Sequence, residues 1–293
     1  MSLFQKDLIT KAVSEERFTR IKNEDTLPIK SIKYCLSELP KGIDSIDAVA
    51  IPSKSSSYWY KLKRKGKWTI DDYIEEQYKY WLPKLIDGMD INESSYLSHR
   101  IDTDQYASSF WKESLNNKQM IDDFNDKHFS RIIAEALRIN EDIIHRIDHH
   151  RCHAYYGYYA GPIRNRPVMV MTIDGWGDDC NASINIFDSH GSFKCLYKSI
   201  NANIGRIYRY ITLLLGMKPN EHEYKVMGLA PYSKDETARK PYEIFKSTLY
   251  VDGIEFKWNI KPSDSFFWFK EKLEGCRFDG IAAGLQRWTE ELL

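Results

Sequence analysis

The chain has 293 residues, enough for one large domain or two smaller ones, and its 42 Lys and Arg residues balance its 42 Asp and Glu residues. Zero formal net charge argues against a dedicated nucleic-acid or membrane-surface protein, and no apolar run reaches the roughly 18 residues that a membrane span needs. The five cysteines are scattered and form no CxxC pair, and the N-terminus lacks the long apolar segment of a secretory signal. We therefore expect a reduced, cytoplasmic protein with no membrane partner.

A dense run of charge follows Ala12. It holds five charged residues within eight positions: Glu15, Glu16, Arg17, Arg20 and Lys22. Such a run is usually a solvated loop with internal ion pairs, and spacing alone favours that interpretation. The alternative is a loop that presents arginine and lysine to an anion.

Helical and strand patterns alternate after this run. Apolar residues recur at helical spacing from Pro28 to Leu39, and Pro28 suits the first position of a helix. The run from Asp47 to Ile51 reads as a short buried strand. Helix followed by strand favours an α/β organisation.

The region from Ser53 to Asn117 breaks this pattern. Residues 53–68 interleave aromatic residues with basic ones (Lys61, Lys63, Arg64, Lys65, Lys67), which suits either a solvated surface insertion or a polyanion-binding surface. The first of these is favoured. Thr69 caps a predicted helix that reaches Ile86, residues 92–117 read as loop with short helices, and Met120 to Ile139 form an amphipathic helix.

The second half contains strands and helices in quick succession. The predicted strands cover 143–147, 167–174, 182–187 and 192–198, with a hairpin at 251–258. The predicted helices cover 149–160, 204–215, 224–229, 237–249 and 278–293, the first of them capped by Asp148.

Four of the eight histidines, His145, His149, His150 and His153, fall within nine residues. His149 and His153 are four apart on a predicted helix, so they share a face and can bind one metal ion. The alternative is a pair of histidines bonded to backbone or water, and spacing alone does not decide between the two. His150 points about 100° away from His149 and is less suited to the same ion.

Two further segments carry polar residues beside glycine. Asp174-Gly-Trp-Gly-Asp-Asp179 follows a buried strand, where phosphate and Mg²⁺ often meet backbone amides, but such dipeptides also make ordinary hairpin turns. The segment from Glu223 to Tyr232 holds one cation, Lys225, and by its spacing is a helix end.

Seven motifs in order resemble the carbamoyltransferase family of the NodU/CmcH type. They are VSEERFTRIK (13–22), the PxxxIxYCL helix (28–36), DHHRCHAYYGYY (148–159), TIDGWGD (172–178), NIGRIYRYITLLLG (203–216), EYKVMGLAPY (223–232) and IAAGLQRWTEELL (281–293). Residues 53–118 resemble the family loosely and are expected to be a divergent insertion.

The resemblance implies an α/β chain with the actin-like ATPase (ribonuclease H-like) fold, a mixed sheet flanked by helices, similar to the protein that transfers threonylcarbamoyl to tRNA. It implies an O-carbamoyltransferase that moves a carbamoyl group from carbamoyl-adenylate, made from carbamoyl phosphate and ATP, to a hydroxyl of a saccharide or natural product.

The resemblance also assigns residues. A metal, iron in the family or another divalent ion, is held by His149 and His153 with a later Asp, and Mg²⁺ is a further candidate. Asp174 and Asp178 are the candidate bases, and Lys225 is a candidate catalytic cation. The expected substrate- and nucleotide-binding residues are Arg17, Arg20, Lys22, His150, Gly175, Gly177, Gly205 and Tyr208.

The chain also departs from the family. Members begin with an apolar strand and an HD-containing loop, which MSLFQKDLITKA lacks, and they continue past Leu293. We therefore expect residues 1–293 to be a partial N-terminal domain without its C-terminal half, third metal ligand and adenylate-forming domain. A missing region or partner chain would then be needed, and the chain alone would not complete the transfer.

Two other functions fit the residues. One is a protein that acts on tRNA with a threonylcarbamoyl donor, with residues 61–67 on the RNA. The other is a degenerate binding or scaffold copy that kept the fold and lost the cleft. Composition makes a nucleic-acid partner the weaker prediction.

Overall fold

The computed structural model describes residues 1–6, 8–22, 24, 27–54, 68–91, 129–163 and 165–293. The chain folds as two compact units, one of Met1–Lys67 and Ser94–Asp148, the other of Trp68–Glu93 and His149–Leu293. The basic aromatic stretch from 55 to 67, the segment from 92 to 117 and the predicted helical start at 120–128 lie outside the described residues.

The first unit contains two small sheets. Its elements are β1 (Ser2–Gln5), β2 (Leu8–Ala12), α1 (Glu16–Thr19), α2 (Ile29–Leu36), η1 (Gly42–Ser45), β3 (Val49–Ile51), α9 (Phe129–Leu137), η4 (Glu141–Ile143) and β4 (Ile144–Arg146). Strands β1 and β2 pair antiparallel, and β3 and β4 pair parallel with Val49 opposite Ile144. The predicted helix at 28–39 and the strands at 47–51 and 143–147 are thereby confirmed.

Glu15 is an exception to the predicted solvated charge run, in which Arg17, Arg20 and Lys22 are exposed. Its side chain is buried, and its carboxylate accepts the amide N–H groups of Lys30 at 3.0 Å and Ser31 at 2.7 Å. Burial acts to raise the pKa of this carboxyl, but the hydrogen bonds from Ser31 and Lys30 prevail and hold the pKa below its ordinary value. Pro28 makes no side-chain cap on α2, so Glu15 caps that helix from a distance in the sequence.

The second unit holds the remaining elements. They are α4 (Ile70–Glu76), η2 (Gln77–Trp81), α5 (Leu82–Leu85), α10 (His149–Ala160), β5 (Val168–Gly177), β6 (Cys180–Phe187), β7 (Phe193–Ser199), α11 (Ile204–Leu214), α12 (Glu223–Leu229), η5 (Ala230–Tyr232), α13 (Asp235–Lys246), β8 (Leu249–Asp252), β9 (Glu255–Trp258), α14 (Ser265–Lys272) and α15 (Phe278–Leu292). The predicted capping of the helix after Thr69 is confirmed as a full capping box with Asp72.

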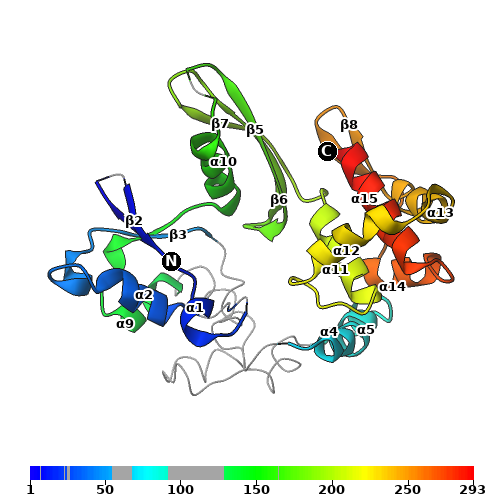
Figure 1. Cartoon of the computed structure of the whole chain (residues 1–293), viewed down its shortest axis with the longest axis horizontal. Helices are drawn as coiled ribbons and strands as arrows, with labels where there is room; N and C mark the ends of the chain where they lie inside the picture. Colours follow the sequence, from blue (N-terminus) through cyan, green and yellow to red (C-terminus); the bar gives the residue numbers. More distant parts are fainter. Residues whose placement is uncertain (7, 23, 25–26, 55–67, 92–128, 164) are drawn as a thin grey trace. The chain divides into compact units, whose positions relative to one another are not determined.

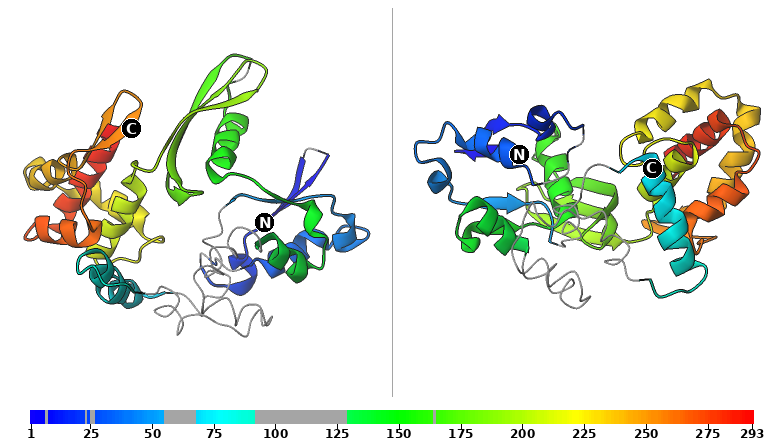
Figure 2. Two further views of the ribbon diagram at one scale, coloured as in Figure 1. Left: turned by 180° about the vertical axis from the view of Figure 1, so that it is seen from behind. Right: turned by 90° about the horizontal axis from the view of Figure 1, so that it is seen from below.

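Helix α10 covers one face of the three-stranded antiparallel sheet β5–β6–β7, as Figures 1 and 2 show from different sides. Tyr158 stacks on Phe187 with ring centroids 4.2 Å apart, and Val168 and Val170 pack beside them. The ideal Cβ of Gly157 would lie 3.1 Å from the Val170 side chain. Close packing therefore fixes α10 over the sheet face that carries Phe187, Val168 and Val170.

The larger core joins α11–α15 and the β8–β9 hairpin. Its most buried large side chains include Phe245, Phe269 and Trp288. Tyr208 of α11 belongs to this core and donates a hydrogen bond to Gln286 of α15 at 2.5 Å. This core holds α11 in place, and α11 in turn contacts β5.

The described residues form a mixed α/β protein, as the sequence predicts. Their strands form four separate small sheets, one of three strands and three of two strands, in place of the one mixed sheet expected. None of the described helices is long and apolar enough to cross a membrane.

The cap on α2 can be tested with Glu15→Gln, which should lower the free energy of unfolding by about 1–2 kcal/mol near neutral pH because it removes a charged hydrogen-bond acceptor. A lowered folded-state pKa contributes stability in full above the unfolded pKa of about 4.3, and this contribution is lost as the pH falls through the folded-state value. Urea denaturation should therefore show a difference that shrinks below about pH 4.

The control is Glu38→Gln, which removes an exposed carboxylate paired with Lys11 at 2.9 Å and should change stability little at any pH. A Glu15→Gln effect of the same size at neutral and acidic pH would contradict the capping role.

Candidate metal centre

The site begins with the turn that joins β5 to β6. Asp178 and Asp179 have φ of 49° and 57°, while Gly177 and Cys180 pair across the strands. Two consecutive positive φ values between paired strands define a type I′ turn. The second interpretation of GWGDD, a hairpin turn, is thus confirmed.

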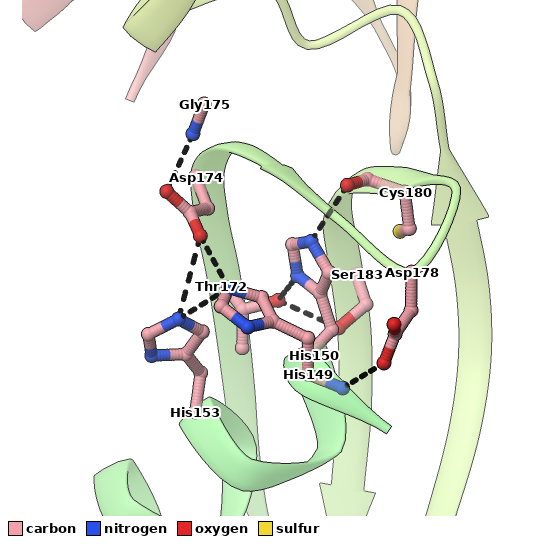
Figure 3. Close-up of polar contacts among 9 residues, drawn as sticks. All are labelled: His149, His150, His153, Thr172, Asp174, Gly175, Asp178, Cys180 and Ser183. Atoms are coloured by element: carbon pink, nitrogen blue, oxygen red, sulfur yellow. Dashed lines mark hydrogen bonds and ion pairs between the residues drawn. The ribbon is translucent and has the colours of Figure 1, made fainter. Parts of the chain in front are cut away.

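This turn caps helix α10. The Oδ2 atom of Asp178 accepts the backbone N–H of His149 at 2.7 Å, as Figure 3 shows. The hairpin thus provides the acceptor at the first amide of the helix, and the predicted capping role of Asp148 stays a prediction. A carboxylate at a helix N-terminus also interacts favourably with the helix dipole.

Gly177 lies against the ring of His149. A Cβ added to Gly177 would lie 2.1 Å from Cδ2 and 2.4 Å from Cγ of that ring, which no side chain tolerates. Gly177 therefore leaves the space that the His149 ring occupies. Its role in nucleotide binding, which the resemblance implies, stays a prediction. A Cβ on Gly175 would meet nothing within 4 Å.

Three side chains converge where α10 begins and β5 ends. The Nε2 atom of His149 lies 2.5 Å from Oδ2 of Asp174 and 3.0 Å from Nε2 of His153, and His153 Nε2 lies 3.5 Å from the same carboxylate oxygen. Figure 3 shows the three pointing toward one another. The register of β5 shifts between Ile173 and Gly177, and such an irregularity re-aims side chains.

The donor set fits a transition metal. Ligands bound to one ion at about 2.0–2.1 Å lie roughly 3.0–3.4 Å from each other, close to two of the three separations here. Only the His149–Asp174 pair, at 2.5 Å, would need to lengthen. Two imidazoles and a carboxylate suit zinc, iron and related ions. The third group, which the sequence places beyond Leu293, thus has a candidate inside the chain.

Asp174 is an anion over the whole neutral range. The hydrogen bond with His149, together with the Gly175 amide 2.5 Å from Oδ1, lowers the pKa of Asp174 to about 2 against the opposing effect of burial. A carboxylate with so low a pKa is a weak base at neutral pH but a good ligand.

His150 faces the protein interior, which corrects the expectation that it contacts substrate. It is 1% exposed. Its Nε2 lies 3.0 Å from the Cys180 carbonyl oxygen and its Nδ1 lies 2.7 Å from the Thr172 hydroxyl. Burial lowers the pKa of His150 in spite of the opposing Cys180 bond.

These contacts determine which groups donate and which accept in a buried hydrogen-bond network. A carbonyl only accepts, so Nε2 of His150 donates and Nδ1 of the neutral ring accepts from Thr172. The hydroxyl of Thr172 then accepts from Ser183 at 2.7 Å, and Ser183 accepts from the Asn185 amide at 2.8 Å. Thr172, Ser183 and Asn185 are not among the site residues predicted from the sequence. Polar residues at every second position of β6 are the signal that could have found them, because they share one face of the strand.

Three further predicted residues lie on helices α11 and α12. Gly205 packs its backbone against Gly175, since its ideal Cβ would lie 3.0 Å from Gly175 Cα and N. Tyr208 lies in the helical core, where burial raises its pKa to about 12. Lys225 is exposed on α12, with Nζ 5.9 Å from the Tyr224 ring centroid.

The three cations of the charge run belong to the first unit. Arg17 lines a shallow surface hollow with Met1, Ala12 and Val13, and Arg20 ends α1 in a left-handed conformation. The predicted binding roles of Arg17, Arg20 and Lys22 stay predictions.

Comparison with known proteins gives one family and several relatives. The family described as carbamoyltransferase N-terminus matches residues 2–293. The uncharacterized protein MJ1058 of Methanocaldococcus jannaschii is 27% identical over 310 residues, covering 94% of this chain and 48% of that protein. The uncharacterized protein sll1178 of Synechocystis sp. is 26% identical over 235 residues, covering 80% and 32%.

A more distant relative has a descriptive name. The nodulation protein NolNO of Sinorhizobium fredii is 22% identical over 242 residues, covering 83% of this chain and 28% of that protein. The chain thus spans less than half the length of each of these three relatives.

The packing of His149 on Gly177 can be tested with Gly177→Ala. The new methyl group should displace the ring and lower the free energy of unfolding by about 1–3 kcal/mol, as overpacking does. Gly175→Ala is the matched control two residues away and should be neutral or slightly stabilising, because its Cβ has open space. Thermal unfolding measures both, and equal effects would refute the packing argument.

The cap can be tested with Asp178→Ala and Asp178→Asn. Alanine removes the acceptor for the His149 amide and should cost about 1–2 kcal/mol, while asparagine keeps an acceptor and tolerates a positive φ. Thermal unfolding should rank wild type and Asp178→Asn together above Asp178→Ala. A loss of stability in Asp178→Asn equal to that in Asp178→Ala would mean that the cap is not what Asp178 provides.

Proposed function

Because the chain belongs to the carbamoyltransferase N-terminus family, we propose that it supplies the metal-holding part of a centre for carbamoyl transfer. The carbamoyl group would pass from carbamoyl-adenylate, formed from carbamoyl phosphate and ATP, to a hydroxyl of a saccharide or natural product. The observation that carries this proposal is the convergence of His149, His153 and Asp174, whose ligand atoms all lie within 4.8 Å of one another.

In this proposal the three residues hold one divalent ion, iron by family resemblance. When bound, the ion would supply Lewis acidity toward an oxygen of the donor. Gly177 and Asp178 orient His149. Gly177 leaves space for the ring, and the Asp178 carboxylate accepts a hydrogen bond from the backbone amide. The ligands are therefore positioned by groups that are not ligands themselves, as in well-ordered metal sites.

The proposed transfer is a displacement at the carbamoyl carbon. The acceptor hydroxyl oxygen attacks the carbamoyl carbon, the bond from that carbon to the adenylate phosphate oxygen breaks, and AMP leaves. The hydroxyl proton passes to a base. Asp174 is poorly suited to that task because its pKa is about 2, and Asp178 already accepts an amide. These contacts favour a ligand role for Asp174 and a positioning role for Asp178.

The actin-like fold is part of the same proposal. An antiparallel sheet covered by α10 and a parallel pair, β3–β4, are compatible with that fold class. The intact His149–His153–Asp174 group counts against a degenerate copy, which has no need to keep it. No described residue favours the tRNA alternative, whose basic stretch lies outside the described residues.

The proposal is tested by metal binding and transfer in the same variants. His149→Ala, His153→Ala and Asp174→Asn should each weaken binding of Fe²⁺ or Co²⁺ by about 100-fold or more in anaerobic calorimetry, since each removes one of three ligands. His190→Ala, in the exposed β6–β7 turn, is the control and should bind as wild type.

For transfer, metal-loaded protein would be given prepared carbamoyl-adenylate and a panel of saccharides. We expect acceptor-dependent release of AMP and a saccharide heavier by one carbamoyl group, both lost in the three ligand variants. Metal binding that survives all three substitutions would overturn the centre. AMP release that ignores both the acceptor and the variants would overturn the transfer.

A further inference from the structure

Arg206 holds an unusual position next to the metal group. Its guanidinium lies 4.5 Å from the ring centroid of Trp176, a distance typical of a cation–π contact. Both side chains are exposed, Trp176 to 38%. Trp176 comes two residues after Asp174 in the irregular end of β5. An arginine is thus held open to solvent beside the proposed centre.

The charge of Arg206 is not balanced by a carboxylate within the described part of the chain. The titratable side chains that act on it most strongly are Tyr210 and a second cation, Arg209. The comparison with Arg287 is informative, because that guanidinium lies 4.3 Å from the Tyr242 ring but also pairs with Glu291 at 3.5 Å. Arg209 in turn has Glu76 at 3.9 Å.

The helix adds to this positive charge. Arg206 lies in the first turn of α11, where the helix dipole is positive and acidic residues are usual. That turn contains no acidic residue, and Asn203 makes no side-chain cap. The amide of Asn203 donates instead to the carbonyl oxygens of Ile200 and Asn201. The positive charge of Arg206 and the positive end of the α11 dipole therefore add to each other.

The contact between Gly205 and Gly175 brings this positive end to the centre. Gly205 precedes Arg206, and its ideal Cβ would lie 3.0 Å from the Gly175 backbone and 3.4 Å from the carbonyl carbon of Asp174. The Asp174 carboxylate itself is directed to His149, His153 and the Gly175 amide. The carboxylate of Asp174 therefore already has three polar partners of its own.

We propose that Arg206 and the first turn of α11 bind a phosphate group of the ligand, with Trp176 holding the guanidinium in place. Arginine presents a planar fork of donors that matches a phosphate, and free amides at a helix N-terminus complete such a site. This inference rests on the proposed function insofar as the phosphate is the adenylate phosphate of the carbamoyl donor.

The test is calorimetry on the metal-free chain at low salt with AMP, inorganic phosphate, glucose 6-phosphate and uncharged adenosine. Wild type should bind AMP more tightly than adenosine. Arg206→Gln should weaken AMP binding by about tenfold or more, equivalent to about 1.4 kcal/mol, and Arg206→Lys should lose less. Added salt should weaken the binding, as screening requires.

Arg287→Gln is the matched control, since it removes an exposed arginine that also lies over an aromatic ring, and it should bind AMP as wild type. Trp176→Phe keeps a ring under the guanidinium and should have a smaller effect than Arg206→Gln. Circular dichroism checks that each variant is folded.

Equal AMP affinity of wild type and Arg206→Gln would overturn the site. Dependence on Arg206 for glucose 6-phosphate but not for AMP would overturn the donor assignment and point to a phosphorylated acceptor. The AMP titrations contain no metal ion, so their outcome does not depend on metal binding. Failure of the metal centre or of transfer is therefore distinguishable from failure of this site.

Discussion

The candidate centre depends on one docking contact, the β5–β6 turn against the first turn of α10. Three consecutive residues make it. Gly177 leaves space for the His149 ring, Asp178 accepts the His149 amide, and Asp179 completes the type I′ turn. Because His149 is held at its backbone and at its ring, its Nε2 atom is directed at Asp174. His153 follows from the helical period alone.

Neighbouring histidines of α10 have different roles because their surroundings differ. His150 is buried, and each ring nitrogen has a partner that fits one neutral tautomer. Such a satisfied polar network stabilises a unique packing of helix on sheet. At His149 and His153, by contrast, two nitrogens and a carboxylate oxygen face one another. Protons alone satisfy that arrangement less well than one cation would.

The end of β5 is also where two helices of the second unit begin. Helix α10 begins at His149 and is capped by the Asp178 carboxylate. Helix α11 has its first turn against Gly175 and carries Arg206 where an acid is usual. The N-terminus of α10 is therefore neutralised by a carboxylate of the protein. The N-terminus of α11 keeps its positive charge beside His149, His153 and Asp174. This asymmetry is the physical basis for the separate cation and phosphate positions that we propose.

The local structure of the site follows from the amino-acid sequence. The helix at 149–160, the strand before Asp174 and the shared face of His149 and His153 follow from periodicity and turn chemistry, which act between near neighbours. Four other features are visible in the folded chain alone: Asp174 joins the histidines, Gly177 leaves space for the His149 ring, His150 points inward and Glu15 is buried. Each of these depends on contacts between separate elements, and a strand irregularity between Ile173 and Gly177 shifts the side chains that simple alternation would place. Periodicity carries no information on such contacts, because they are set by how closely two backbones approach.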